Sequence, residues 1–310
     1  MKSFITVIFL ISIQFLSFGE GKDTVIKCLN QVPEFHIFQK NKTGWEVSGN
    51  FGVYKANKHQ AQFYNGASQN ANNLEYIFNN YYWRQEIINQ FVIHAQRDSF
   101  QISQIPTNIK YDMSMYVGFS ARYHFSGSLA LNFSVNFAKL KTRDVVVFEV
   151  FPAYSGMVES FVNCGIYGIE ARTNIDAGLL YTFNPEKQIT GFAEMGLNLN
   201  SIKVKKNFMQ IFDNEYNLVN IYANNSYIPN TQLNEYEVNQ GGIGFGTYSS
   251  LGIRYTMSEL FAMELAGIAY LKTANLEGYN KLFGLHGGLM FRLVFSPNFS
   301  FGEPEDTIEY

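Results

Sequence analysis

Hydrophobic and polar residues alternate along most of the chain after residue 43, and the segment 111–125 shows the pattern most clearly. Its odd positions are Tyr, Met, Met, Val, Phe, Ala, Tyr and Phe, whereas its even positions are Asp, Ser, Tyr, Gly, Ser, Arg and His. Successive side chains of a β-strand point to opposite faces, so this alternation predicts a strand with one apolar and one polar face. Residues 129–138 repeat the pattern directly after Ser126-Gly127, which predicts a tight hairpin.

The same period predicts eight strands, near 43–55, 109–125, 128–141, 161–183, 188–205, 241–256, 260–273 and 282–296. Segment 161–183 is either one long strand or two strands that meet around Arg172-Thr173. Short connections at 126–127, 184–187 and 258–259 alternate with longer ones at 56–108, 142–160, 206–240 and 274–281. An even number of strands with short turns at one end and long loops at the other is typical of an outer-membrane barrel.

Alternation alone leaves open whether the apolar face points towards lipid or into the centre of a secreted β-sandwich or lipocalin-like barrel. Three features favour lipid. The polar face is rich in glycine and serine, which a narrow eight-stranded interior needs. Its charges are mixed in sign, which suits a paired internal network; they are Glu46, Asp112, Arg122, Glu170, Arg172, Asp176, Glu194, Arg254, Glu264, Lys272 and Arg292. Aromatic residues recur on the apolar face near strand ends, as in interfacial girdles; they are Tyr111, Tyr123, Phe125, Tyr181, Phe183, Tyr255, Phe261 and Phe295.

We therefore expect an all-β fold: a closed, antiparallel, up-and-down transmembrane β-barrel of about eight strands, with short periplasmic turns and long extracellular loops. The composition agrees, since 46% of the 310 residues are hydrophobic, 16% are charged and the net charge is −3. Disordered chains carry high charge with few aromatic residues, and nucleic-acid binders carry a basic surplus, so both classes are excluded.

The N-terminus has the features of a cleaved secretory signal. Lys2 precedes an apolar run over 4–18, and Ser17-Phe18-Gly19 supplies small residues for cleavage after Gly19. We expect a signal peptide at 1–19, a periplasmic segment at 20–42, the barrel at 43–296 and an acidic tail at 297–310. Whether the two cysteines, Cys28 and Cys164, form a disulfide stays open.

The strand pattern, including Met113-Ser-Met-Tyr-Val-Gly-Phe-Ser-Ala-Arg-Tyr-His-Phe125, resembles the small eight-stranded outer-membrane β-barrel proteins of Gram-negative bacteria. The Asn- and Tyr-rich loops are similar to Bacteroidetes-type members. This resemblance covers about residues 43–296 and implies an outer-membrane location. It departs from the family at the end of the chain, where members often stop at the aromatic residue of the last strand. Here a tail follows Phe295.

The long 56–108 connection contains the candidate binding residues. A helix over 74–91 is compatible with its sequence, and it carries Tyr76, Phe78, Tyr81, Tyr82 and Trp83. These rings either form an extracellular surface for an envelope protein or a glycan, or they cap the barrel mouth and bury themselves. The Asn-rich 206–240 connection is expected to be a solvated outer loop.

The interior charges either line a pore or fill the lumen, and eight strands favour filling. No pair among the five histidines has metal-ligand spacing, so we expect neither a metal site nor a cofactor. His124 and His286 share the polar face with Ser120 and Ser250, but the sequence does not bring them together. The run Gly241–Gly246 imitates a phosphate loop but opens a strand rather than a helix.

Three functions remain. The first is a non-enzymatic outer-membrane barrel that contacts membrane lipid and presents its loops for binding or envelope assembly. The second is a narrow, porin-like solute channel. The third is a lipid-modifying enzyme of the outer membrane.

Overall fold

The structure, a computed structural model, describes residues 43–152, 160–219, 240–276, 279 and 283–297. The predicted signal peptide and periplasmic segment, and the tail beyond residue 297, lie outside these residues. The strands are β1 (Gly44–Lys55), β2 (Arg97–Gln104), β3 (Ser114–His124), β4 (Leu129–Pro152), β5 (Ser160–Phe183), β6 (Ile189–Ile211), β7 (Asn214–Asn217), β8 (Gly241–Thr256), β9 (Phe261–Thr273) and β10 (Phe283–Phe295). The helices are α2 (Lys58–Ala61), the 3-10 helix η1 (Gln62–Tyr64), α3 (Glu75–Phe78) and α4 (Tyr81–Ala95).

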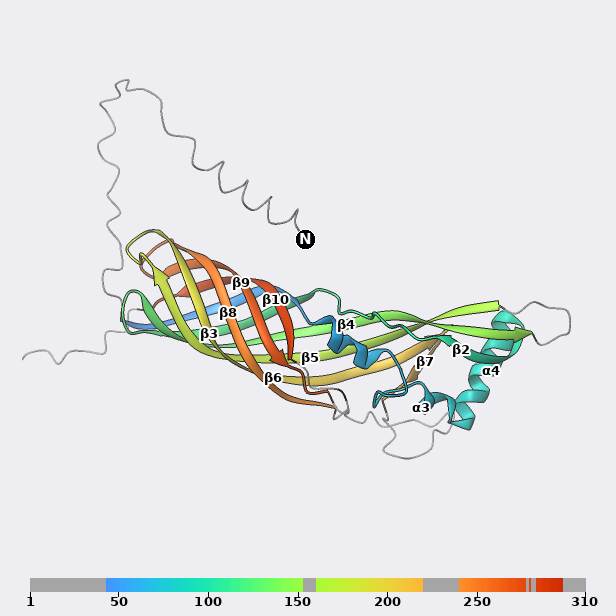
Figure 1. Ribbon diagram of the computed structural model, residues 1–310. Helices are drawn as coiled ribbons and strands as arrows, with labels where there is room; N and C mark the ends of the chain where they lie inside the picture. The colour runs from blue at the N-terminus through green and yellow to red at the C-terminus, as the bar shows by residue number, and fades with distance from the viewer. Residues whose placement is uncertain (1–42, 153–159, 220–239, 277–278, 280–282, 298–310) are drawn as a thin grey trace, which may run out of the picture. The chain divides into compact units, whose positions relative to one another are not determined.

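Eight strands of the described chain close into a ring, with the order β1-β3-β4-β5-β6-β8-β9-β10 (Figure 1). Every neighbouring pair is antiparallel, and the pairing of β10 with β1 closes the sheet on itself. The register is continuous between Val47↔Phe295 and Lys55↔Gly287 at this closure. The predicted closed up-and-down β-barrel is therefore confirmed.

The apolar face of each ring strand points out of the barrel. On β10, Leu285, Leu289 and Leu293 are 46–67% exposed, whereas the alternate residues His286, Met290 and Arg292 are at most 2% exposed. We call the outward apolar side chains of the eight ring strands the belt. At the short-turn end the belt finishes in aromatic contacts, such as Trp45 with Tyr123 and Phe261 with Phe295. A one-residue slip would place every interior charge on the outside, so the burial pattern fixes a single register.

The three short connections are tight turns. Phe125 N–H donates to the Leu129 carbonyl, Lys187 N–H to the Asn184 carbonyl, and Met257 N–H to the Phe261 carbonyl. Asn184 has a φ of 50°, in the left-handed region where asparagine is tolerated better than most residues.

Three predicted boundaries were wrong. The expected loop 142–160 is strand over 142–152, because β4 and β5 continue as a paired ladder to Val150↔Ser160. Similarly β6 continues to Ile211, and β7 pairs with it, so the start of the expected 206–240 loop is also sheet. Segment 161–183 is one strand, with a register shift against β6 between Ile169 and Glu170. The predicted strand 109–125 begins too early, because β3 starts at Ser114 and residues 109–113 precede it.

The long strands form an extension beyond the ring at its long-loop end (Figure 1). Its sheet has the order β2-β4-β5-β6-β7, and helices α3 and α4 contribute to its core. Asn80 caps the start of helix α4, because its side chain accepts from the Tyr82 and Trp83 backbone amides. Gln96, in the left-handed conformation, caps its end. Among the described residues, no helix has both the length and the apolar composition required for a bilayer crossing.

Candidate functional site

The interior of the barrel holds a balanced set of buried charges. In the described residues, five acidic and five basic side chains are at most 5% exposed; they are Glu46, Glu170, Asp176, Glu194, Glu264, Arg122, Arg172, Arg254, Lys272 and Arg292. Each comes from the lumen-facing phase of a ring strand. Because an unpaired buried charge costs several kcal/mol (order of magnitude), such a set is stable only when it is paired.

Glu264 on β9 is the centre of the network near the short-turn end. It accepts from Arg122 Nη2 at 2.7 Å, and its oxygens lie 3.4 Å from Arg254 Nη1 and 3.5 Å from Arg292 Nη1. Arg254 also binds both carboxylate oxygens of Glu46, at 2.7 and 2.9 Å. The Arg122–Glu264 and Arg254–Glu46 pairs thus join strands that are not neighbours, whereas Arg254 and Arg292 reach Glu264 from the two strands paired with β9.

A second network fills the middle of the barrel. Asp176 on β5 accepts from Asn198 at 2.6 Å, from Tyr270 at 3.0 Å and from Ser134 at 3.2 Å. The hydroxyl of Tyr270 also meets that of Tyr116 at 2.5 Å, from the opposite side of the ring. Hydrogen bonds therefore cross the lumen as well as running along its wall.

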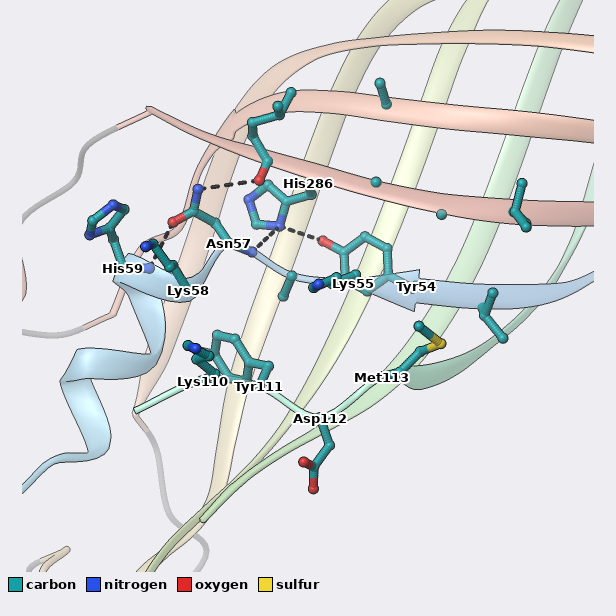
Figure 2. Close-up of a pocket in the computed structure, with 17 residues that line it drawn as sticks. Tyr54, Lys55, Asn57, Lys58, His59, Lys110, Tyr111, Asp112, Met113 and His286 are labelled. Atoms are coloured by element: carbon teal, nitrogen blue, oxygen red, sulfur yellow. Dashed lines mark hydrogen bonds between the residues drawn. The ribbon is translucent and has the colours of Figure 1, made fainter. Parts of the chain in front are cut away.

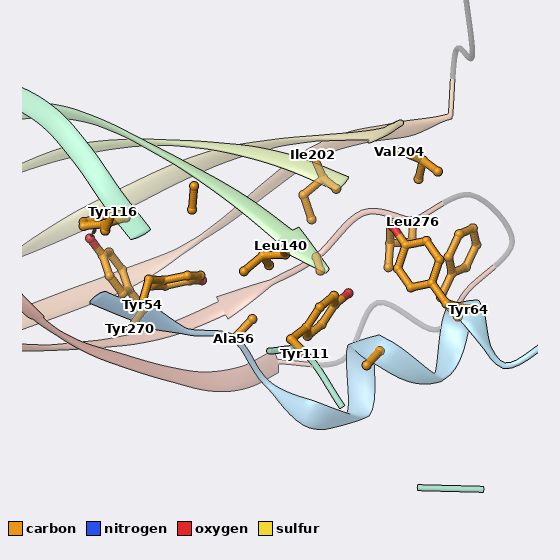
Figure 3. Close-up of a cluster of buried hydrophobic side chains, with 14 of the residues drawn as sticks. Tyr54, Ala56, Tyr64, Tyr111, Tyr116, Leu140, Ile202, Val204, Tyr270 and Leu276 are labelled. Carbon is orange, nitrogen blue, oxygen red and sulfur yellow. Dashed lines mark hydrogen bonds between the residues drawn. The ribbon is translucent and has the colours of Figure 1, made fainter. Parts of the chain in front are cut away.

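The first part of the 56–108 connection closes the lumen at the long-loop end. Tyr64 of η1 donates to Glu170 at 2.6 Å, and Gln60 of α2 accepts from Arg172 at 3.0 Å. Tyr111 donates to Glu170 at 3.1 Å. Burial and the neighbouring Glu170 carboxylate raise the pKa of Tyr64 well above its usual value, so its hydroxyl stays a donor. Figure 3 shows Tyr64 and Tyr111 beyond three tyrosines of the barrel strands, Tyr54, Tyr116 and Tyr270. All five belong to one apolar cluster.

Ten of the eleven charges proposed for the interior network lie in the lumen, and Asp112 is the exception. Its side chain is 52% exposed and lies 4.0 Å from Arg143 on the outside. Tyr111 was placed on the lipid-facing side, and this too was wrong, because it is 6% exposed and points inward. Both errors have one cause: β3 begins only at Ser114, and the alternation is broken between Tyr111 and that residue.

The five aromatic residues proposed for binding in the 56–108 connection divide into two groups. Trp83 is 3% exposed, and Tyr76 and Phe78 pack against the same core of the extension. Ring contacts at 5.6 Å between Tyr76 and Trp83, and at 5.8 Å between Phe78 and Phe148, fix them there. Tyr81 and Tyr82 are instead 69% and 50% exposed.

Helix α4 has apolar residues on two sides. Trp83, Ile87 and Phe91 are buried against the sheet, whereas Tyr81 and Tyr82 at its start, and Val92 and Ile93 at its end, are exposed. Residues eleven apart on an α-helix lie on nearly the same side, about 16 Å apart. The exposed rings and aliphatic groups therefore share one outer surface, which we call the α4 surface.

A groove of about 1140 Å³ lies where β1 leaves the wall of the ring. Its lining includes Tyr54 and His286 from the lumen side, Leu289 from the belt, and Met113 from the segment before β3. Figure 2 shows His286 between Tyr54 and Asn57. Its Nδ1 accepts from the Tyr54 hydroxyl at 2.8 Å and from the Asn57 backbone amide at 3.2 Å. The sequence did not indicate this site, nor Gln60 and Tyr64, because each depends on a loop residue meeting a distant strand.

The serine and histidine candidates for an enzyme do not come together. Ser120 bonds to Ser48 and Asn50, and Ser250 bonds to Glu194, whereas His124 lies 3.0 Å from Glu46. His286 bonds to Tyr54, as described above. These partners are structural neighbours in the filled lumen.

No protein-family model and no curated protein matches the chain. It is similar to the outer membrane protein OprG from Pseudomonas aeruginosa, with 10% identity, a TM-score of 0.39, and 84% of this chain and 100% of that chain covered. Neisserial surface protein A gives 11% identity, a TM-score of 0.38 and coverage of 82% and 97%. Ail, the attachment invasion locus protein of Yersinia pestis, gives 10% identity, a TM-score of 0.30 and coverage of 82% and 98%. The fold described above rests on the strand pairing alone.

Proposed function

We propose that this protein is a non-enzymatic outer-membrane β-barrel whose extension presents a docking surface outside the cell for an envelope protein or a glycan. The observation that carries this proposal is the α4 surface. Exposed aromatic side chains are held on a rigid support, above a barrel whose lumen is filled.

The belt supports the membrane location. Leucine, phenylalanine and methionine side chains stay exposed on the ring strands, as Leu251 (67%), Phe119 (59%) and Met195 (71%) illustrate. Soluble monomers rarely expose apolar patches of more than a few hundred Å². Strands β9 and β10, with 13 residues each, exceed the roughly 9–11 residues that a tilted strand needs to cross a bilayer.

The extension supports the docking role. Its core buries Trp83, Ile87 and Phe91 of α4 against Val146, Phe148 and Met209 of the sheet. Tyr81 and Tyr82 therefore stand on a helix that is already ordered. Rigid aromatic anchors lose little conformational entropy on binding, which is why such residues dominate binding hot spots.

The filled lumen supports a scaffold over a solute channel. Paired charges occupy the short-turn half of the lumen, and Gln60 and Tyr64 close its other end. Single-channel recording of the full chain in planar bilayers is expected to give no stepwise conductance at neutral pH. Regular steps that persist across preparations would favour the channel instead.

Deleting the whole 60–105 segment is a poor test of docking, because it removes Gln60 and Tyr64 from the barrel mouth. A cleaner experiment places a photo-crosslinking residue at Tyr82 of the full chain in intact cells of the source bacterium. We expect a discrete adduct that Tyr81→Ser reduces several-fold, because it removes the neighbouring ring 5.8 Å away.

Two controls are needed. The first carries the same crosslinker at Lys187, in a turn at the opposite end of the barrel. The second keeps the crosslinker at Tyr82 and replaces Tyr81→Ser by Arg84→Ser. Arg84 is an exposed residue of the same helix. Equal adducts from Tyr82 and Lys187, or no adduct from either with the protein folded at the cell surface, would overturn the docking role.

A further inference from the structure

A group of basic side chains lies on the outside of the barrel, directly beyond the belt at the long-loop end. We call it the rim patch; it consists of Lys139, Lys141 and Arg143 on β4, and Lys203, Lys205 and Lys206 on β6. Lys139, Lys141, Arg143, Lys205 and Lys206 are exposed, and Lys203 is half-buried.

The strand register shows that the patch begins where the belt ends, directly on β4 and after one outward residue, Ser201, on β6. On β4 the last outward belt residue is Phe137, 44% exposed, and the next outward residue is Lys139. The ladder aligns Lys139 with Ala171 of β5, and Ala171 with Lys203 of β6. On β6 the belt ends at Leu199, 46% exposed, two outward positions before Lys203. The apolar and basic surfaces therefore meet at the same height on β4 and β6, on the two sides of β5.

An irregularity in β6 adds a charge to this surface. Ile169 pairs with Lys206, but Glu170 pairs with Val204, so Lys205 is an extra residue in β6. Such a bulge breaks the alternation and lets two consecutive side chains face outward. Lys205 and Lys206 are both exposed as a result.

The strand between the two basic rows is uncharged on its outer face. Its outward residues there are Tyr167, Ile169 and Ala171. The rows on β4 and β6 lie two strands apart, which is about 10 Å. Arg143 lies 4.0 Å from Asp112, and both side chains are exposed. Six basic side chains in two rows thus flank an uncharged strip of β5.

We infer that the rim patch binds the phosphate groups of an anionic lipid in the outer leaflet, of the lipopolysaccharide type. This inference rests on the membrane location proposed above and adds a ligand class to it. A lipid whose chains pack on the belt places its headgroup phosphates at the height where the belt ends, and the lysines and arginine are found at that height. Lysine and arginine near a membrane surface attract anionic lipids in this way.

The position favours a lipid over a soluble polyanion. A soluble ligand would be expected on the outermost surface of the extension, whereas the rim patch is continuous with side chains that face hydrocarbon. Tyr167, which pairs with Arg143 of the patch, stacks on Phe208 at 5.1 Å, and tyrosine is an amphipathic residue typical of a bilayer interface.

The test uses the full chain folded in nanodiscs of phosphatidylcholine that contain a few per cent of bisphosphorylated lipid A or its dephosphorylated form. Lipid A retained with the protein after transfer to detergent is counted by native mass spectrometry. We expect selective retention of the phosphorylated form. Lys139→Gln/Lys141→Gln/Lys206→Gln is expected to lower the apparent affinity by at least about tenfold, because several phosphate contacts are lost together.

The control Lys55→Gln/Lys58→Gln/Lys187→Gln removes the same net charge from exposed lysines outside the patch, and it is expected to bind as the natural chain does. Equal retention by both triple variants, equal retention of dephosphorylated lipid A, or competition only by a soluble sulfated sugar would overturn the inference. Failure to insert into phosphatidylcholine alone would instead refute the proposed membrane location, so the two failures are distinguishable.

Discussion

Neutralising Glu264 tests whether the buried charges hold the barrel together. This carboxylate on β9 contacts Arg122 at 2.7 Å and lies within 3.5 Å of both Arg254 and Arg292. Glu264→Gln keeps the size of the side chain and removes one of the five interior negative charges. Five positive charges would then face four negative ones in a lumen without solvent exposure.

The expected loss of stability follows from the burial. Breaking a buried ion pair by removing one partner costs about 3–5 kcal/mol, because the remaining charge is left uncompensated. Glu264 serves three arginines, although Arg254 keeps Glu46 and Arg292 keeps Glu194 at 2.9 Å. Arg122 therefore loses most, and we expect Glu264→Gln to fall within that range.

The assay is urea unfolding of the full chain in phosphatidylcholine vesicles, followed by the heat-modifiable migration of the folded barrel on gels. Asp112→Asn is the matched control, since it neutralises an acid whose arginine partner is 4.0 Å away and solvent-exposed. Exposed pairs contribute about 0–1 kcal/mol. A Glu264→Gln variant as stable as Asp112→Asn would refute the view that the interior network is structural.

Three further changes probe the rest of the molecule. Leu289→Arg, at an outward position that is 58% exposed, should destabilise the barrel in lipid by about 2–4 kcal/mol. The control Ser201→Arg, at the margin of the belt, should cost only about 0–1 kcal/mol. Similar urea midpoints for the two variants would contradict the lipid-facing phase. Phe91→Ala should cost the extension about 3–5 kcal/mol and speed amide exchange in α4 while leaving the ring protected; unchanged exchange in α4 would argue against the packed core. Burial raises the pKa of the Cys164 thiol to about 12, so a maleimide at pH 8 should label it only after denaturation; rapid labelling of the folded protein would show that the extension is open there.

The ring could be predicted from sequence because its outer and inner faces carry different kinds of side chain on alternate residues. Each of the eight predicted strands overlaps one ring strand, and the lumen-facing phase was assigned correctly for residues such as Arg122, Glu194 and Arg292. Apolar residues predominate on the outer face and polar or charged residues on the inner face, so the alternation is clear along the ring strands.

The extension could not be predicted, because the pattern changes where the strands leave the ring. Lys141 and Arg143 interrupt the outward apolar series of β4 and suggest a loop. Beyond them the inward face no longer meets the lumen but the helices, so Val146, Phe148 and Val150 are apolar and buried. With apolar residues on both faces, 145–151 loses its period of two even though it is strand.

The closure of the lumen was also beyond sequence reasoning. Gln60 and Tyr64 meet Arg172 and Glu170 across more than 100 residues of chain, and nothing in their local sequence indicates those partners. The loop aromatics were predicted as a group, but only their position on α4 separates the buried Trp83 from the exposed Tyr81.

Spin labels placed by cysteine substitution at Leu289 and Met290 test most directly whether the belt faces hydrocarbon. The two neighbours are 58% and 1% exposed, so their side chains lie on opposite sides of the barrel wall. In phosphatidylcholine bilayers, a label at Leu289 should be relaxed strongly by oxygen and weakly by a water-soluble nickel complex, and a label at Met290 should be relaxed weakly by both. If the nickel complex relaxed the label at Leu289 as strongly as one at Lys141 on the rim patch, the outer face would be in water and the membrane location would be wrong.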